Sequence, residues 1–111
     1  MPPLQPATFH ILLALANKER HGYDIMKQSI EDSGGRVKLG PGTLYGNIKK
    51  MIVSGLIEET NERPDPSLDD SRRRYYRLTA RGISTLNAEM DRMSSLVTLG
   101  HKRGMFHTIA V

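Results

Sequence analysis

Residues that begin or end helices divide this 111-residue chain at four points, and these points constrain its fold more than any other feature. Gly34 and Gly35 end one helical segment. Pro41 begins the next, because proline fits the first helical turn, where its missing N–H would have no partner. Gly55 suits a C-terminal cap and Thr79 an N-terminal cap. The pattern therefore predicts helices on both sides of residues 34–41 and a last helix after residue 79.

Apolar spacing defines the segments between these points. Helices are predicted over about residues 7–17, 22–33 and from residue 41, and the third has its apolar residues at steps of three and four (Leu44, Ile48, Met51, Ile52). Residues 56–60 and 72–78 are predicted to be strands, the second with Tyr76 and Leu78 on one face and Tyr75 and Arg77 on the other. Three helices, a two-stranded hairpin and a further helix make a winged helix-turn-helix, mainly α with a small β-hairpin. We assign residues 1–79 to this domain and residues 80–111 to a C-terminal dimerisation helix and tail.

The last helix carries an apolar seam. Ile83, Leu86, Met90, Met93 and Val97 follow one another at steps of three and four, which is an a/d pattern over two heptads. A lone protomer would expose this stripe, so the seam predicts a homodimer. The predicted dimer interface combines the seam with two residues of the strongly apolar first helix, Phe9 and Leu12.

Charge is distributed in blocks along a chain of net charge +4. Between residues 36 and 57 there are four cations and no acid, and between residues 72 and 81 five cations and no acid. The segment between these blocks, residues 58–70, holds six acids and one cation. If the fold brings the two cationic blocks together, they form a face that attracts phosphate.

Several classes of protein are excluded or disfavoured. The chain has no cysteine, which excludes disulfides, thiolate metal sites and cysteine nucleophiles. Its four histidines show no metal-ligand spacing, and no serine or aspartate falls in a catalytic arrangement, so we expect no metal, no cofactor and no enzyme. The longest clean apolar run, residues 11–16, is too short to span a bilayer, and no basic residue precedes it as in a signal peptide. We therefore expect a cytoplasmic protein.

Four motifs resemble those of PadR-type transcriptional regulators. They are HGYDI at residues 21–25, LGPGTLY at 39–45, GLI at 55–57 and RYYRLT at 74–79. Each is weak alone, but their order and spacing match the family across nearly the whole chain, and the short last helix resembles that of the smaller members. The hairpin loop is longer and more acidic than the family pattern.

The resemblance implies that the third helix enters the major groove of DNA and that the hairpin reaches the flanking backbone. Lys49 and Lys50 lie past the first helical turns and are predicted phosphate ligands, whereas Thr43 and Asn47 are predicted to influence sequence preference. The full set of predicted DNA-binding residues is Tyr23, Arg36, Lys38, Gly42, Thr43, Tyr45, Asn47, Lys49, Lys50, Arg72 and Arg74. The same exposed residues would also fit an ordinary solvated helix face and a solubilised edge strand.

The hypothesis that follows is a homodimeric repressor acting on a pseudo-palindromic site in double-stranded DNA. Similarity to PadR-type dimers implies a small hydrophobic or aromatic effector near the dimer seam, where methionines adapt to varied shapes. The alternative is a winged-helix protein-interaction module without DNA binding. Salt dependence separates the two, because phosphate contacts make affinity fall steeply as salt rises.

Overall fold

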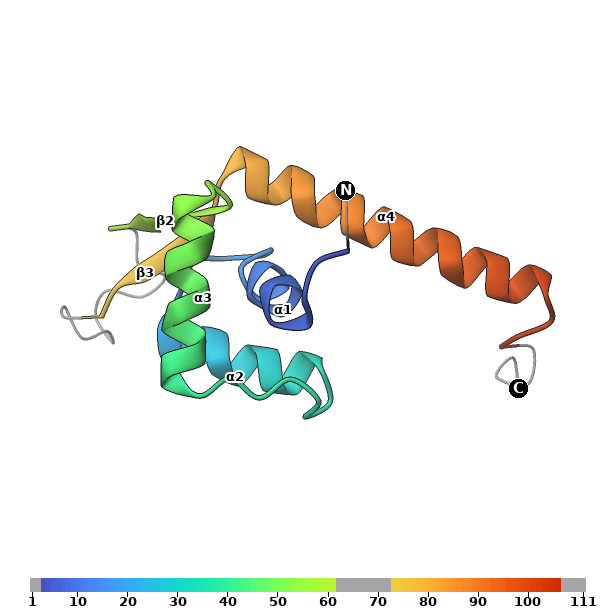
Figure 1. The fold of residues 1–111 in the computed structure, drawn as a ribbon, viewed down its shortest axis with the longest axis horizontal. Helices are drawn as coiled ribbons and strands as arrows, with labels where there is room; N and C mark the ends of the chain where they lie inside the picture. The colour runs from blue at the N-terminus through green and yellow to red at the C-terminus, as the bar shows by residue number, and fades with distance from the viewer. Residues whose placement is uncertain (1–2, 62–72, 107–111) are drawn as a thin grey trace.

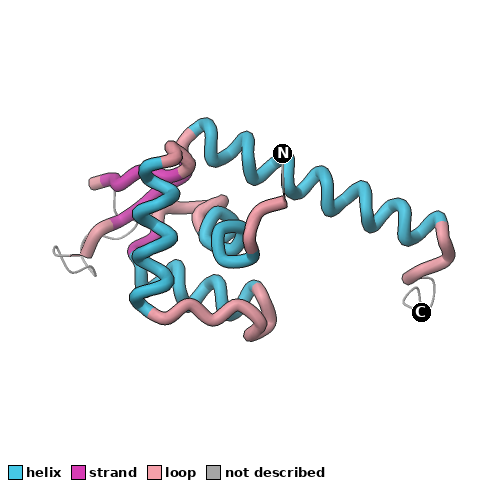
Figure 2. Tube along the Cα trace, viewed as in Figure 1, coloured by secondary structure: helices cyan, strands magenta, loops and turns pink. Residues whose placement is uncertain are grey.

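Three short helices and a small sheet pack together at one end of the molecule, and a long fourth helix leads away from them (Figure 1). The computed structural model describes residues 3–61 and 73–106. Figure 2 shows the helices, strands and connections along this trace. The elements, in chain order, are α1 (Pro6–Ala14), β1 (Arg20–His21), α2 (Gly22–Asp32), α3 (Pro41–Val53), β2 (Ile57–Thr60), β3 (Tyr75–Leu78) and α4 (Ala80–Lys102).

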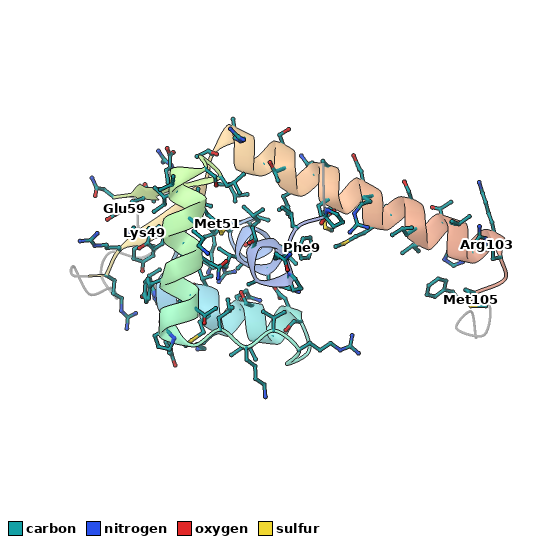
Figure 3. The ribbon with its side chains drawn as sticks, viewed as in Figure 1. Phe9, Lys49, Met51, Glu59, Arg103 and Met105 are labelled. Atoms are coloured by element: carbon teal, nitrogen blue, oxygen red, sulfur yellow. The ribbon has the colours of Figure 1, made fainter. Side chains whose placement is uncertain are left out.

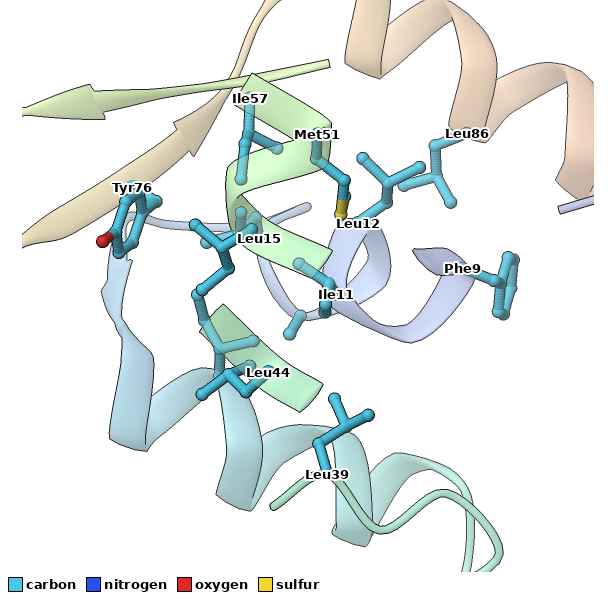
Figure 4. Packing of buried hydrophobic residues seen from close by; sticks show 13 residues of the cluster. Phe9, Ile11, Leu12, Leu15, Leu39, Leu44, Met51, Ile57, Tyr76 and Leu86 are labelled. Carbon is cyan, nitrogen blue, oxygen red and sulfur yellow. The ribbon is translucent and has the colours of Figure 1, made fainter. Parts of the chain in front are cut away.

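The core is built around α1 (Figure 4). Ile11 and Leu12 of α1 have no exposed surface, and α2 adds the fully buried Ile25. α3 contributes three of the four residues of its predicted apolar stripe, Leu44, Ile48 and Met51. Burying each such side chain contributes roughly 1.5–3 kcal/mol. Because this core is built around α1, α1 is the element that holds the other helices together.

α1 ends at Ala14, three residues before the predicted end. A buried arginine from the following turn lies at this helix end. Arg20 donates from Nε to the carbonyl oxygen of Ala14 at 2.6 Å and from Nη1 to Asp24 at 3.0 Å. A guanidinium therefore satisfies a carbonyl that the helix end would otherwise leave without a partner, and it ties α1 to α2.

The sheet is antiparallel, in the order β1-β3-β2. The sequence predicted a two-stranded hairpin and missed β1, which is only two residues long and pairs Arg20 with Tyr76 and His21 with Tyr75. Because β3 is the central strand, Tyr75 and Tyr76 are both buried, although they point to opposite faces. The rings of Tyr75 and His21 pack perpendicular to each other, with 5.3 Å between ring centroids.

α4 begins at a tight corner with the wing, the name used here for β2 and β3. Thr79 caps the helix as predicted, accepting a hydrogen bond from the Gly82 amide at 3.0 Å. Gly82 lies against the carbonyl of Leu56, where a Cβ would clash with the backbone. From this corner α4 runs along the other helices and then projects beyond them (Figure 1). None of the helices in residues 3–61 and 73–106 is long and apolar enough to cross a membrane.

The face that α4 turns toward the core differs from the predicted seam. Gly82, Leu86 and Glu89 are the buried residues of α4, and Met93 packs against the core from a half-buried position. Leu86 therefore belongs to the core of its own protomer, as do Phe9 and Leu12. This corrects the expectation that the whole seam lies exposed in a lone protomer. The exposed members are Ile83, Met90 and Val97, which retain 50%, 44% and 48% of their surface.

Candidate nucleic-acid interface

The outward face of α3 is polar, cationic and open. Lys49 points away from α1, whereas Met51, on the other side of the same helix, points toward it (Figure 3). Lys49 and Lys50 are both exposed, and neither forms an ion pair within the described part of the chain. Gly46 lies on the same face, with open space where its side chain would be. Two unneutralised ammonium groups on an accessible helix are suited to contact phosphate oxygens.

Thr43 and Asn47 lie one helical turn apart on α3, nearer its start. Asn47 donates from Nδ2 to the carbonyl oxygen of Thr43 at 2.8 Å. This bond orients the amide and leaves its oxygen and second N–H for an outside partner. An oriented amide is the group that reads adenine edges in the major groove, so the geometry is compatible with the predicted influence on sequence preference.

Tyr45 packs back onto the start of α2. A Cβ at Gly22 would lie 2.7 Å from Tyr45 Cζ, so glycine is the residue that leaves room for this ring. Tyr45 still keeps half of its surface exposed. It therefore fixes α3 against α2, a role that the sequence motif did not show.

A cleft of about 320 Å³ lies between α2, α3 and β3. Its lining combines three of the predicted DNA-binding residues with four others: His21, Gly22, Tyr23, Tyr45, Arg73, Arg74 and Tyr76. A neighbouring groove of about 250 Å³ is lined by residues that include Lys49, Val53 and Arg74. The two cationic blocks thus meet at one surface, since Lys49 belongs to the first and Arg74 to the second.

His21 is a residue of this cleft that the sequence analysis did not select. Its Nδ1 accepts the Asp24 amide at 3.2 Å and caps α2. Its Nε2 lies 2.9 Å from Arg73 Nη1, within hydrogen-bond distance. His21 therefore links the start of α2 to the arginine that precedes β3. The position of His21 directly before the helix start was the available signal.

Two arginines in and directly before β3 are partly neutralised by β2. Arg77 donates to Glu58 at 2.8 Å, and Arg74 lies 3.7 Å from Glu59. Glu59 also helps to raise the pKa of Tyr76, although burial of the phenol is the larger cause. The Arg74 pair is long and exposed, so Arg74 can exchange its partner for phosphate at little cost.

The remaining predicted residues are separate from the cleft or lie outside the described residues. Arg36 and Lys38 are exposed in the segment between α2 and α3, on either side of the half-buried Val37. Arg72 and the acidic residues 65–70 are outside the described ranges. Within the described residues, no group of three histidine or acidic side chains could hold a metal ion.

A helix-turn-helix followed by a small antiparallel wing, with a cationic surface where α3 meets the wing, defines a winged-helix protein of the transcription-regulator class. The family model described as "Transcriptional regulator PadR-like family" matches residues 11–88. The chain therefore belongs to the PadR-like family, whose members are transcriptional regulators rather than enzymes.

Solved structures share this fold. A PadR family transcription regulator from Clostridium difficile R20291 is 26% identical, with a TM-score of 0.69, and the match covers 88% of this chain and 97% of that one. Bacillus subtilis PadR in complex with operator DNA is 24% identical, with a TM-score of 0.62 over 78% of this chain and 47% of that one. At that identity the second likeness shows the fold alone.

One curated relative matches in sequence. It is an uncharacterized 37.1 kDa protein in transposon TN4556 of Streptomyces fradiae, 34% identical over 86 residues. The match covers 78% of this chain, but it spans only 22% of the length of that relative.

Proposed function

We propose that the chain is a homodimeric regulator that binds double-stranded DNA through α3 and the wing, at a pseudo-palindromic operator. The observation that carries the proposal is the shared groove of Lys49 and Arg74, because it joins the two cationic blocks on the exposed side of α3. B. subtilis PadR, which has the same fold, was solved on operator DNA.

In this proposal the contacts divide by chemistry. The predicted phosphate ligands are the cations of the two blocks, Arg36, Lys38, Lys49, Lys50, Arg72 and Arg74, and such contacts position the protein without reading sequence. Gly42, Thr43 and Asn47 lie at and after the start of α3, where recognition helices meet base edges. Tyr23 and Tyr45 line the cleft, and in this proposal their hydroxyls donate to phosphate oxygens at the groove edge.

The dimer of the proposal forms through α4. Ile83, Met90 and Val97 make one exposed stripe, and Leu96 and Leu99 add apolar surface where the helix projects beyond the core. A second copy of the same helix covers such a stripe by two-fold symmetry. Residues 1–79 then bind DNA and residues 80–111 pair the protomers. Because Leu86 and Met93 also pack on the core, dimer geometry and DNA-binding geometry are mechanically linked.

Repression in the cytoplasm completes the proposal, with release by a small hydrophobic or aromatic ligand held at the Met90 and Met93 region of the seam. The flexible thioether side chains there can repack around such a ligand. Thermal shift measurements with a panel of aromatic and aliphatic compounds test this part separately from DNA binding.

The main experiment is selection of bound fragments from genomic DNA, followed by anisotropy titrations of the best fragment at several salt concentrations. We expect a two-fold symmetric site and an affinity that falls steeply with salt. A protein-interaction module is the second candidate, favoured by Val53, which is 82% exposed on α3. Absence of binding to any DNA at low salt would overturn the proposal in favour of that module.

A further inference from the structure

Glu89 is a buried carboxylate on the face of α4 that meets the core. It keeps only 6% of its surface exposed. Its Oε2 accepts the backbone N–H of Leu4 at 2.7 Å, and its Oε1 accepts Arg92 Nε at 2.6 Å. Arg92 first, and then Leu4, lower the pKa of the Glu89 carboxyl, so it is ionised at neutral pH. The sequence pattern did not select Glu89, because an acid does not belong to an apolar seam.

The Leu4 bond joins α4 to the start of α1. The segment before α1 runs up to the middle of α4 (Figure 1). Gln5 then caps α1 without a side-chain hydrogen bond, and its carbonyl accepts the Phe9 amide at 2.9 Å. Since α1 is the centre of the core, Glu89 links the long helix directly to the element that holds the DNA-binding helices together.

Glu89 is also far along the helix from its fixed corner. At the corner, Thr79 and Gly82 hold α4 against the backbone of residues 55–56. Among the described residues, the Leu4–Glu89 bond is the hydrogen bond to the core that lies farthest from this corner. Beyond it, within the described part of the chain, only Met93 packs on the core, and residues 94–99 are exposed. Apolar contacts are non-directional, so this bond is the directional restraint on the tilt of α4.

A small tilt of α4 has a large effect at its far end. The helix extends about 34 Å from Thr79 to Lys102 at a rise of about 1.5 Å per residue, so a tilt of about 6° moves the far end by about 3.5 Å. That displacement is close to the length of one base-pair step, since about 34–36 Å of duplex holds 10–10.5 base pairs.

We propose that Glu89 is a positioning residue, which holds Leu4 and thereby sets the tilt of α4 and the spacing between the two recognition helices of a dimer. Glu89 thereby controls the length of DNA that a dimer accepts between its two operator half-sites. This inference rests on the proposed function, because spacing has meaning only for a dimer that binds two half-sites.

The test is a competitive selection from a DNA library in which two half-sites are separated by spacers of different lengths. Wild type is expected to select one spacing. Glu89→Ala removes the acceptor and should accept neighbouring spacings within about threefold of the best one. Glu89→Gln keeps a carbonyl oxygen for the Leu4 amide and should restore the wild-type preference. Arg92→Ala breaks only the ion pair with Glu89 and should also keep the wild-type spacing preference.

A second pair of variants tests the same hydrogen bond by changing its donor, the backbone N–H of Leu4. Leu4→Pro removes the backbone N–H without altering α4, and Leu4→Ala removes the side chain but keeps the N–H. Leu4→Pro should broaden the spacing preference and Leu4→Ala should not, so the result does not depend on Glu89→Ala folding. Leu39→Ala, in the core below α3, controls for general destabilisation and should lower affinity without broadening the preference.

The outcomes separate the two proposals. Suppose that wild type selects one spacing and that Glu89→Ala and Leu4→Pro both show the same narrow preference. The positioning role is then wrong, while the proposal of a dimeric regulator stands. If wild type selects single half-sites without a preferred spacing, or selects no DNA, the proposed function itself fails.

Discussion

Lys49 illustrates what a single residue is expected to contribute at the proposed DNA-binding surface of the protein. Lys49→Ala should weaken binding to all sequences alike and reduce the slope of log affinity against log salt by about one unit, because one phosphate contact is lost. Anisotropy titrations of specific and random duplexes at several salt concentrations measure both quantities. Lys102→Ala, at the far end of α4, is the matched control and should leave the slope unchanged. A changed sequence preference with an unchanged slope would contradict the assignment.

Gly46 has no structural reason to be glycine. It lies inside α3, and a Cβ there would meet no atom within 4 Å. Gly46→Ala should therefore stabilise the fold by about 0.5–1 kcal/mol, as measured by urea unfolding. The added methyl group projects from the face proposed to enter the groove, so DNA affinity should fall while stability rises. Equal or tighter DNA binding would show that this part of α3 keeps its distance from the duplex.

The exposure of a side chain was predictable where it depends on local position, and pairings were not predictable where they depend on register. Lys49 and Lys50 lie off the apolar stripe of α3 and are exposed, as its spacing predicts. The pairing of Glu58 with Arg77 follows only from the β2–β3 register, which places these residues opposite one another. Likewise, the contact of Tyr45 with Gly22 depends on how α3 crosses α2.

At the scale of elements, the caps and breaks predicted the helices well. α3 begins at Pro41 and α4 follows the Thr79 cap, as expected. The orientation of α4 was harder to predict, because apolar spacing alone does not define the side of this helix that meets the core. Its core-facing positions include Gly82, where a backbone carbonyl needs room, and Glu89, whose charge is satisfied by Leu4 and Arg92. Neither has a hydrophobic side chain, so the heptad pattern placed the neighbouring apolar residues in the seam instead.

The Glu89 cluster gives α4 a dependence on pH. Because its hydrogen bonds lower the pKa of Glu89 in the folded chain, the carboxylate stabilises the fold above the ordinary glutamate pKa of about 4.3. That contribution is lost as the pH falls through the lower, folded pKa. The difference in unfolding free energy between wild type and Glu89→Gln should therefore be largest near neutral pH and shrink toward pH 3, as followed by urea denaturation. A difference that is constant across this range would contradict the ionised form.

At the scale of the whole molecule, the exposed stripe of α4 predicts the assembly. Met90→Asp would place an unpaired charge in a dimer seam, so the protein should become monomeric and lose most of its affinity for a two-fold operator. Met90 keeps 44% of its surface in one protomer, and the monomer should therefore remain folded by circular dichroism. Light scattering at micromolar concentration measures the change.

Ser84→Asp adds the same charge to an exposed position of α4 away from the stripe of Ile83, Met90 and Val97 and should leave the dimer intact. A wild-type protein that is itself a folded monomer would contradict the assembly.

The three-stranded sheet also has a consequence for how the chain folds. Its outer strand β1 joins β3 across a long stretch of chain, and the His21–Arg73 contact spans 52 positions. The contacts of α1 with α2 link elements that are adjacent in the chain, so they close much shorter loops. Because closing a long loop is entropically unfavourable before its contacts form, we expect the helices to assemble first and β3 to dock onto β1 late. α4, which leaves directly from β3, then reaches its place on the core only in that last step of folding.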